Sequence, residues 1–285
     1  MNTFIRPTDQ GALAGLSAAA MATLLLLVSL IAYAFDERLL NGINVWIKPI
    51  KFDLSFAIHL FTMVWLWRLV EPAWRAKPGS QWLMPIAAFS SLTELLYITL
   101  QAARGRHSHF NFETPVEYYM YYAVMGGAAL LIVAVTFWLG WLVWRHPRGH
   151  LGAGLHVGAA LGLMLGAVAT LITAGALASG AIGEPGHWVG GIRDDMTGLP
   201  LFGWSTTGGD LRVPHFFATH LTQALPLAGL LVDRLQLKHA KAWVVACAAA
   251  GIVVVIATFI QAAGGRALSA KLAELAATSV ELRFR

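Results

Sequence analysis

The chain has 285 residues, of which 57% are hydrophobic and 12% are charged, whereas ordinary soluble domains are about 25% charged. This composition argues against a soluble globular protein and indicates an integral membrane protein. The formal net charge of +5 does not indicate a nucleic-acid partner, because the basic residues stand between apolar runs, where they set orientation and contact anionic membrane lipids.

Apolar runs close to 20 residues long recur along the chain, and a helix of about this length crosses the roughly 30 Å hydrocarbon layer of a bilayer. They predict an all-α fold: a single integral membrane domain over residues 1–285, built as a polytopic transmembrane helical bundle of about seven spans. The first run is longer than the core of a typical signal peptide, so we expect it to be retained. The predicted spans lie near residues 11–34, 52–70, 82–103, 117–144, 151–178, 213–232 and 242–263.

Glycines of the fifth span are four residues apart and therefore share one helix face, which lets a neighbouring backbone approach closely. They are Gly154, Gly158, Gly162 and Gly166. We interpret this face as tight packing within the chain, and the seam of a homodimer is the alternative.

The sixth span contains Pro226, which removes a backbone hydrogen bond and is expected to kink the helix. The connection before it, residues 179–212, is too long for a turn and carries Trp188, Trp204 and several glycines. Loops of this length are commonly lids or binding loops, so we predict an ordered capping loop. After the last span, leucines at helical spacing predict an amphipathic tail helix over residues 266–282.

Lysine and arginine are dense in the short connections after the second, fourth and sixth spans, as is typical of cytoplasmic loops. These residues are Arg68, Arg75, Lys77, Arg145, Arg148, Arg234, Lys238 and Lys241. The pattern predicts a multi-pass protein of the bacterial inner membrane with a cytoplasmic N-terminus. The capping loop would then lie on the non-cytoplasmic side, among membrane lipids.

Polar and ionisable side chains recur inside three of the spans. Each costs about 2.5–3.5 kcal/mol to place in hydrocarbon, so such residues are candidates for a functional site. They are Asp53, Ser55 and His59 in the second span, Glu94, Tyr97 and Gln101 in the third, and His215, His220 and Gln223 in the sixth.

These side chains are predicted to share one layer of the membrane. At 1.5 Å of rise per residue, His59 lies roughly 12 Å below the non-cytoplasmic surface, and His220 lies roughly 9 Å below it. Tyr97 lies at roughly 10 Å and Glu94 at roughly 15 Å. We therefore expect the three spans to turn these groups toward a common site beneath the capping loop.

Further candidates stand where the spans meet this surface. The cations Lys51, Arg104 and Arg106 would pair with acidic groups of a cofactor, and the loop histidines His107 and His109 would add metal ligands. His215 and His220 diverge by about 140° around a helix, so they can share a metal only if the helix begins after His215.

The strings at residues 48–52 (KPIKF), 101–111 (QAARGRHSHFN) and 203–216 (GWSTTGGDLRVPHF) resemble an uncharacterised family of bacterial multi-span membrane proteins. The resemblance covers most of the chain and implies no activity. Ser55, four residues before His59, is similar to the serine and histidine of alkaline ceramidase-like membrane hydrolases. Those proteins complete a zinc site with a late histidine pair and an aspartate. Here the late pair has a different spacing and stands in the sixth span.

The first functional hypothesis is a redox protein that binds haem or a transition metal (copper, iron or zinc). His59 and His220 would ligate a haem iron from two helices, with the cations paired to the propionates. Tyr97, Gln101 and Gln223 would line the cofactor. A copper site is a variant that draws on His59, His107, His109, His215 and His220.

The second hypothesis is a zinc-dependent membrane lipid hydrolase. Zinc on His59, His215 and His220 would activate a water molecule, with Glu94 or Asp53 as the base. Ser55 is a further catalytic candidate, through the ceramidase resemblance.

The third hypothesis is a proton-coupled transporter in which Glu94 carries the proton and the kink at Pro226 acts as a gate. No inverted repeat is visible in the sequence. We favour the first hypothesis, a buried site that opens to the non-cytoplasmic side and acts on a lipid or a quinone.

Overall fold

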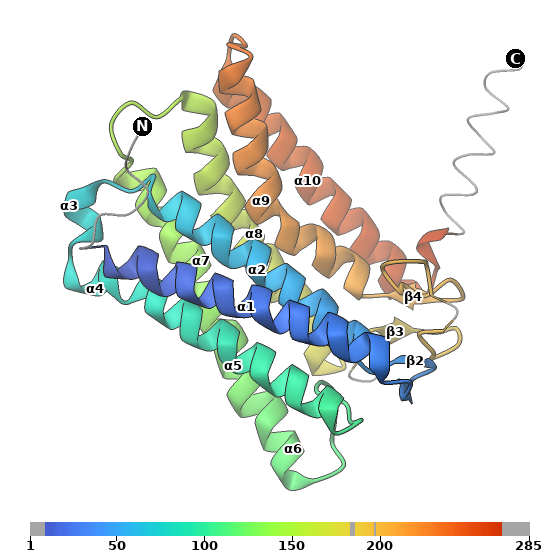
Figure 1. Cartoon of the computed structure of the whole chain (residues 1–285). Coiled ribbons are helices and arrows are strands. Elements are labelled where there is room, and N and C mark those ends of the chain that lie inside the picture. The colour runs from blue at the N-terminus through green and yellow to red at the C-terminus, as the bar shows by residue number, and fades with distance from the viewer. Residues whose placement is uncertain (1–8, 183–185, 197, 270–285) are drawn as a thin grey trace, which may run out of the picture. The chain divides into compact units, whose positions relative to one another are not determined.

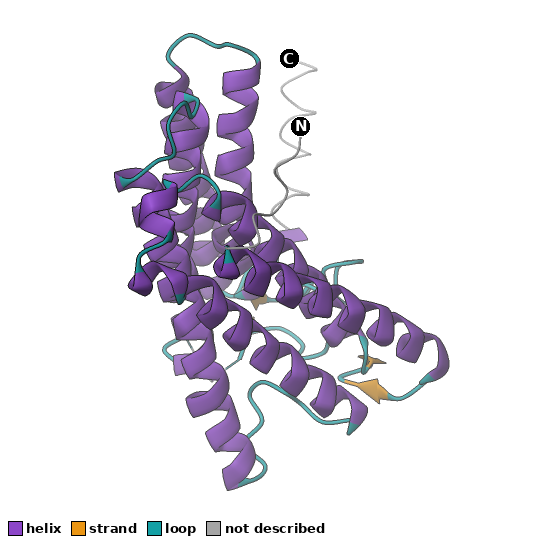
Figure 2. Ribbon diagram, turned by 60° about the vertical axis from the view of Figure 1, so that its left-hand side comes forward, coloured by secondary structure: helices purple, strands orange, loops and turns teal. Residues whose placement is uncertain are grey.

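The computed structural model describes residues 9–182, 186–196 and 198–269, and helices make up most of them (Figure 1). The strands are two-residue segments in the connections between helices (Figure 2). Contacts divide the chain into two compact units. Among the described residues, unit 1 comprises 9–40, 44–168 and 220–249, and unit 2 comprises 41–43, 169–182, 186–196, 198–219 and 250–269.

Among the described residues, seven long helical segments follow one another, with shorter elements between them. The first half contains α1 (Gln10–Phe35), β1 (Leu39–Leu40), β2 (Ile43–Asn44), α2 (Ile47–Trp67), α3 (Pro72–Arg75), α4 (Pro78–Gln81), α5 (Leu83–Ala103) and α6 (Pro115–Tyr119). The second half contains the π-helix η1 (Met120–Met125), α7 (Gly126–Arg145), α8 (Ala153–Ser179), β3 (Trp188–Val189), β4 (Gly209–Asp210), α9 (Arg212–Arg234) and α10 (Ala240–Ala263). Helices α8, α9 and α10 each contribute residues to both units.

All seven predicted spans coincide with helical segments. Six of these, among the residues described, are long and apolar enough to cross a membrane: Gln10–Phe35, Ile47–Trp67, Pro78–Ala103, Pro115–Arg145, Ala153–Ser179 and Ala240–Ala263. The remaining predicted span, the sixth, is α9, which is helical over 23 residues but more polar than the others. Its first half carries Arg212, two histidines, two threonines and Gln223. The helical character of the prediction is confirmed, and within the described part of the chain six helices could cross a membrane by length and apolarity.

In unit 1, α1, α2, α5 and α7 pack against one another around a shared core. The buried face of α2 follows the helical spacing of three and four residues, from Asp53 through Ala57 and Leu60 to Trp67. Since lipid is as apolar as these side chains, close packing and hydrogen bonds hold such helices together rather than exclusion of water. Asp9 reinforces the core by capping α1 and accepting a hydrogen bond from the Trp67 indole at 3.0 Å.

The glycine face of α8 packs directly on α9 within unit 1. A Cβ atom at Gly154 would lie 2.5 Å from the carbonyl oxygen of Gly229, and one at Gly162 would lie 2.8 Å from the carbonyl oxygen of Leu221. The prediction of tight packing is therefore confirmed. At these positions the alternative of a homodimer seam is wrong, because α9 of the same chain occupies the face.

The Asp233 carboxylate joins the end of α9 to the beginning of α8. Asp233, near the end of α9, accepts hydrogen bonds from the backbone nitrogens of Gly154 (2.8 Å) and Leu155 (2.7 Å). These nitrogens belong to the first turn of α8, where backbone donors have no partner within the helix and where the helix dipole favours a negative charge. Asp233 thus fixes the register in which the glycines of α8 meet α9.

Unit 2 contains the described part of the predicted capping loop, which is folded. Strands β3 and β4 pair antiparallel, with Trp188 opposite Asp210 and Val189 opposite Gly209. Gly209 packs so closely on the backbone of Ala262 that no side chain would fit there. The predicted tail helix over 266–282 lies largely outside the described residues.

Candidate functional site

Asp53 faces the interior of unit 1. It is completely buried on α2, and the Ser29 hydroxyl of α1 donates to its Oδ2 at 2.7 Å. Its other oxygen, Oδ1, is buried and has no hydrogen-bond partner in the described part of the chain. Ser55, two residues further on, is exposed, because two helical residues separate it from Asp53 by about 200°. The prediction that Ser55 faces the interior is therefore wrong.

His59 and His220 both lie in unit 1. The two imidazoles, on α2 and α9, are close enough to interact electrostatically. His59 Nε2 is buried and has no hydrogen-bond partner among the described residues. His220 Nδ1 lies 3.3 Å from Oε1 of Gln223, one turn further along α9. Such a hydrogen bond to one ring nitrogen is what commonly orients a metal-ligating histidine.

His215 does not join this pair. It belongs to unit 2, and its Nδ1 lies 3.0 Å from the Thr173 hydroxyl of α8. Helix α9 begins at Arg212, so His215 and His220 are both helical and diverge by about 140°. The condition for a metal shared by these two histidines, a helix that begins after His215, is not met.

A multi-ligand metal centre is not formed by the described residues. Within 9–182, 186–196 and 198–269, no three His, Cys, Asp or Glu side chains lie together in a way that could hold a metal ion. The five-histidine copper site and the three-histidine zinc site predicted from the sequence are thus not assembled. A site with two histidine ligands from the protein, as in haem ligation, needs only the His59–His220 pair.

Glu94 lies on the buried face of α5 and is 4% exposed. Its electrostatic partners are Lys48 on α2 and Tyr121 on η1. Tyr121 is buried in η1. Lys51, a predicted cofactor ligand one turn beyond Lys48, is half-buried.

Tyr97 and Gln101 belong to a hydrogen-bond network at the end of α5. The Gln101 amide donates to the Tyr97 hydroxyl at 3.2 Å, to the His107 carbonyl at 3.1 Å and to Glu117 at 3.5 Å. In return, Arg104 donates to Gln101 Oε1 at 2.8 Å. Gln101 is completely buried, so this network replaces the water that its amide would otherwise need.

The two loop arginines are therefore engaged within the protein. Arg106 forms an ion pair of 2.7 Å with the buried Glu117 and a second one with Glu113. Arg104 holds Gln101, as described above. Their predicted role as partners of an acidic cofactor has no support in these contacts, which instead fasten the loop after α5 to the start of α6.

His107 and His109 take structural positions in the same loop. The His107 carbonyl accepts hydrogen bonds from Gln101 and Asn111. The His109 ring packs on Phe52 and Tyr121, with ring centroids 5.4 and 5.8 Å apart.

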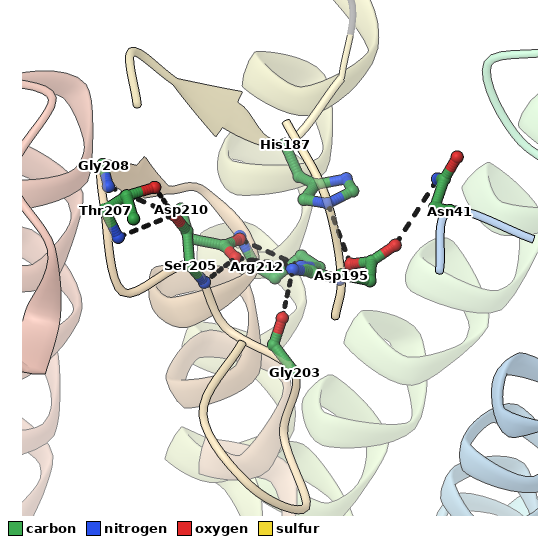
Figure 3. Close-up of polar contacts among 9 residues, drawn as sticks. All are labelled: Asn41, His187, Asp195, Gly203, Ser205, Thr207, Gly208, Asp210 and Arg212. Carbon is green, nitrogen blue, oxygen red and sulfur yellow. Dashed lines mark hydrogen bonds and ion pairs between the residues drawn. The ribbon is translucent and has the colours of Figure 1, made fainter. Parts of the chain in front are cut away.

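Unit 2 contains a charge network that sequence reasoning missed (Figure 3). Arg212 donates to both oxygens of Asp210, to Oδ1 of Asp195 at 2.9 Å and to the Gly203 carbonyl at 2.6 Å. Asp210 also accepts from the Ser205 and Arg212 backbone nitrogens, both at 2.9 Å. The small and polar residues at 203–211 thus form a turn around the Arg212 side chain, and α9 begins at Arg212.

His187 and Asp195 face one another in this network. His187 Nε2 lies 3.7 Å from Asp195 Oδ1, within ion-pair range but beyond a hydrogen bond. Burial would raise the pKa of Asp195, but the neighbouring His187 ring and Arg212 guanidinium outweigh it and hold the pKa at about 2. Burial lowers the pKa of His187, because its desolvation outweighs the attraction of Asp195.

Two kinds of arrangement therefore stand out. Unit 1 holds ionisable groups inside membrane-length helices: two histidines within electrostatic reach of one another, and the buried carboxyl of Glu94. Unit 2 holds a network in which Arg212 pairs with both Asp195 and Asp210. Comparison of the chain with protein-family models, with curated proteins and with solved structures finds no match.

Proposed function

We propose that the protein is a multi-pass membrane redox protein that binds haem between His59 on α2 and His220 on α9. We also propose that it lies in the bacterial inner membrane with a cytoplasmic N-terminus, so that the site opens to the non-cytoplasmic side. A membrane-soluble lipid or quinone would then be its electron donor or acceptor.

The observation that carries this proposal is the buried Nε2 of His59, which has no hydrogen-bond partner among the described residues, with His220 within electrostatic reach. An imidazole nitrogen buried without a hydrogen bond costs on the order of 1–3 kcal/mol. His59 Nε2 is in that position among the described residues, and a second imidazole lies within electrostatic range. A ligand that accepts a lone pair from His59 would remove the cost.

The residues around the pair fit a metal centre in which two imidazoles are the protein ligands. Gln223 restrains the His220 ring through Nδ1, as a hydrogen bond beyond the ligand does in metal sites. A haem bound there would supply one-electron chemistry, while the protein would bind, orient and shield it.

The experiment is to purify the full chain in detergent from cells supplied with a haem precursor. The absorption spectrum and the iron, copper and zinc contents are then measured. We expect a Soret band and stoichiometric iron in the wild type, both lost in His59→Ala and in His220→Ala. His215→Ala is the matched control on α9 and should keep both.

Three results would contradict the proposal. A colourless protein without iron would overturn it. Stoichiometric copper or zinc without a Soret band would overturn the haem assignment. Equal loss of haem in His215→Ala and His220→Ala would show that the loss reflects general damage to α9 rather than removal of a ligand.

A further inference from the structure

We propose that Asp53 is the anionic ligand of a buried sodium site, to which side-chain oxygens of α1, α2 and α5 contribute. The three side chains are those of Ser29, Asp53 and Thr99, all of which lie in unit 1. The site uses neither His59 nor His220, so this proposal and the haem proposal can fail independently.

Asp53 is a carboxyl group without a counter-charge. Its side chain is 0% exposed, and its hydrogen bond within the described chain is the one that the Ser29 hydroxyl donates to Oδ2 at 2.7 Å. No lysine, arginine or histidine among the described residues forms an ion pair with it. Lys51, two residues before it on α2, stands about 200° away around the helix. A carboxylate buried in this way needs a positive partner, because an unpaired charge in apolar surroundings is very costly.

The second oxygen of Asp53 indicates where that partner would bind. Oδ1 is buried and has no hydrogen-bond partner in the described part of the chain. A buried polar atom without a partner costs about 1–3 kcal/mol, and more when the group is charged. A cation bound at Oδ1 would balance the charge of Asp53 and satisfy this oxygen in one step.

Thr99 on α5 provides a second oxygen in the same condition. Its Oγ1 is buried and has no hydrogen-bond partner among the described residues. A threonine inside a helix commonly donates to the carbonyl four residues earlier. Thr93, on the same helix, does so to Phe89 at 2.9 Å, whereas Thr99 makes no such bond to Leu95. The Thr99 hydroxyl therefore has its lone pairs available for a cation.

Helix packing places these side chains in one layer. Helices α1, α2 and α5 pack on one another (Figure 1). Two apolar clusters join the same three segments: one contains Ala22, Ala57 and Leu95, and the other contains Ala32, Trp46 and Ala102. Ser29, Asp53 and Thr99 each stand between the two cluster members of their own segment, at helical spacings of three, four or seven residues. They therefore lie on the faces that pack together, in the layer between the clusters.

The charge and the ligand types select the ion. One carboxylate is neutralised by one monovalent cation, whereas a divalent ion would leave a positive charge buried. Magnesium and calcium also require six or more oxygen ligands, and copper and zinc prefer nitrogen or sulfur. The described residues form no cluster of three His, Cys, Asp or Glu side chains, which a transition metal would require but an alkali ion would not. Alanines in both flanking clusters let the helices approach closely, which favours sodium over the larger potassium ion.

The test is equilibrium binding of radioactive sodium to the full chain, purified in an uncharged detergent and a sodium-free choline buffer. The wild type should bind sodium saturably, and lithium should compete more strongly than potassium. Asp53→Asn keeps the shape of the side chain but removes its charge, so it should abolish the binding. Thr99→Val should weaken binding about tenfold, the effect of losing one contact of about 1.4 kcal/mol. Thr93→Val is the matched control on α5 and should bind sodium like the wild type.

A second measurement needs only the wild type, in case the variants fold poorly. Since a ligand that binds the folded state stabilises it, replacing choline chloride with sodium chloride at constant ionic strength should raise the unfolding midpoint. The proposal is overturned if the wild type shows neither saturable binding nor this rise, or if Asp53→Asn binds sodium equally well. It is also overturned if Thr99→Val and Thr93→Val bind alike, or if infrared spectra show Asp53 protonated in saturating sodium. Sodium binding by a protein without haem would leave this proposal standing and overturn the haem proposal alone.

Discussion

Asp195 links the described part of the capping loop to the start of α9 through charge. Its carboxylate accepts from Arg212 at 2.9 Å, and its side chain is 12% exposed. A paired carboxylate at such a position contributes to stability only while it is ionised. The pH dependence of unfolding therefore reports on this contact.

We predict that Asp195 makes the protein sensitive to acid. Asp195 has a pKa of about 2 in the folded chain, against about 3.9 when unfolded. Between these values the unfolded chain holds more protons, so about 2 kcal/mol of stability that is present above pH 4 is lost as the pH falls toward 2. Thermal unfolding midpoints of the detergent-solubilised protein across this range should show the loss, and Asp195→Asn should show less of it.

The control is Asn41→Ala, which removes a 3.5 Å contact to Asp195 but keeps the carboxylate. It should retain the acid sensitivity of the wild type. His187 adds a separate effect at higher pH: since its folded pKa is lowered, its contribution is lost as the pH falls below about 6.5. If Asp195→Asn and the wild type lose stability equally below pH 4, Asp195 is not the group responsible.

Individual site residues were only partly predictable. Helical spacing and depth identified His59, His220 and Glu94, because an ionisable residue in an apolar span stands out from its surroundings. Spacing does not reveal which neighbour faces a residue, since that depends on how each helix is rotated in the bundle. Ser29, the hydrogen-bond partner of Asp53, is a single hydroxyl among apolar residues, and nothing in the sequence around it indicated this contact.

Tyr121 shows a second limit. It stands in a run that contains Tyr118, Tyr119, Tyr121 and Tyr122, a composition typical of a membrane interface. The π-helical turn rotates this segment relative to a regular α-helix, so the face on which Tyr121 lies could not be obtained from a period of 3.6 residues.

At the scale of helices, the packing of α8 on α9 depends on glycine residues, because they have no side chain that would hold the two helices apart. At Gly158 an added Cβ would collide with the backbone carbonyl of Leu225, an atom that cannot move without shifting α9. Gly175, later on α8, has no heavy atom within 4 Å of the same position. The two glycines offer a matched pair of substitutions.

We predict that Gly158→Ala destabilises the protein by about 1–3 kcal/mol, the usual range for overpacking. Gly175→Ala should be neutral or stabilising by up to about 1 kcal/mol, because alanine loses less backbone freedom than glycine in a helix. Unfolding midpoints in one detergent would compare them. Equal effects of the two substitutions would contradict the close contact between α8 and α9.

The helices themselves were the most predictable feature, since length and hydropathy alone determine where a chain can cross a bilayer. The boundaries of α5 and α10 agree with the prediction to within two residues. The sixth predicted span is the exception. Its apolar second half made 213–232 resemble a span, whereas the polar first half of α9 makes it the least apolar of the long helices.

For the whole molecule, the distribution of ionisable groups is the main argument for function. Asp53, His59 and Glu94 all lie in unit 1 within membrane-length helices, and each costs about 2.5–3.5 kcal/mol to insert. Ser29 offsets part of this cost for Asp53. For Nε2 of His59 the described residues provide no hydrogen bond that would offset it, which is why we assign the proposed redox role to this residue.

Electron paramagnetic resonance of the oxidised, purified protein tests the central claim, that His59 and His220 ligate one iron, most directly. The account predicts a low-spin ferric haem signal in the wild type, because two axial imidazoles give a strong ligand field. It also predicts a high-spin signal or loss of haem in His220→Ala. A wild-type spectrum that is high-spin, or that contains no haem iron at all, would contradict the account.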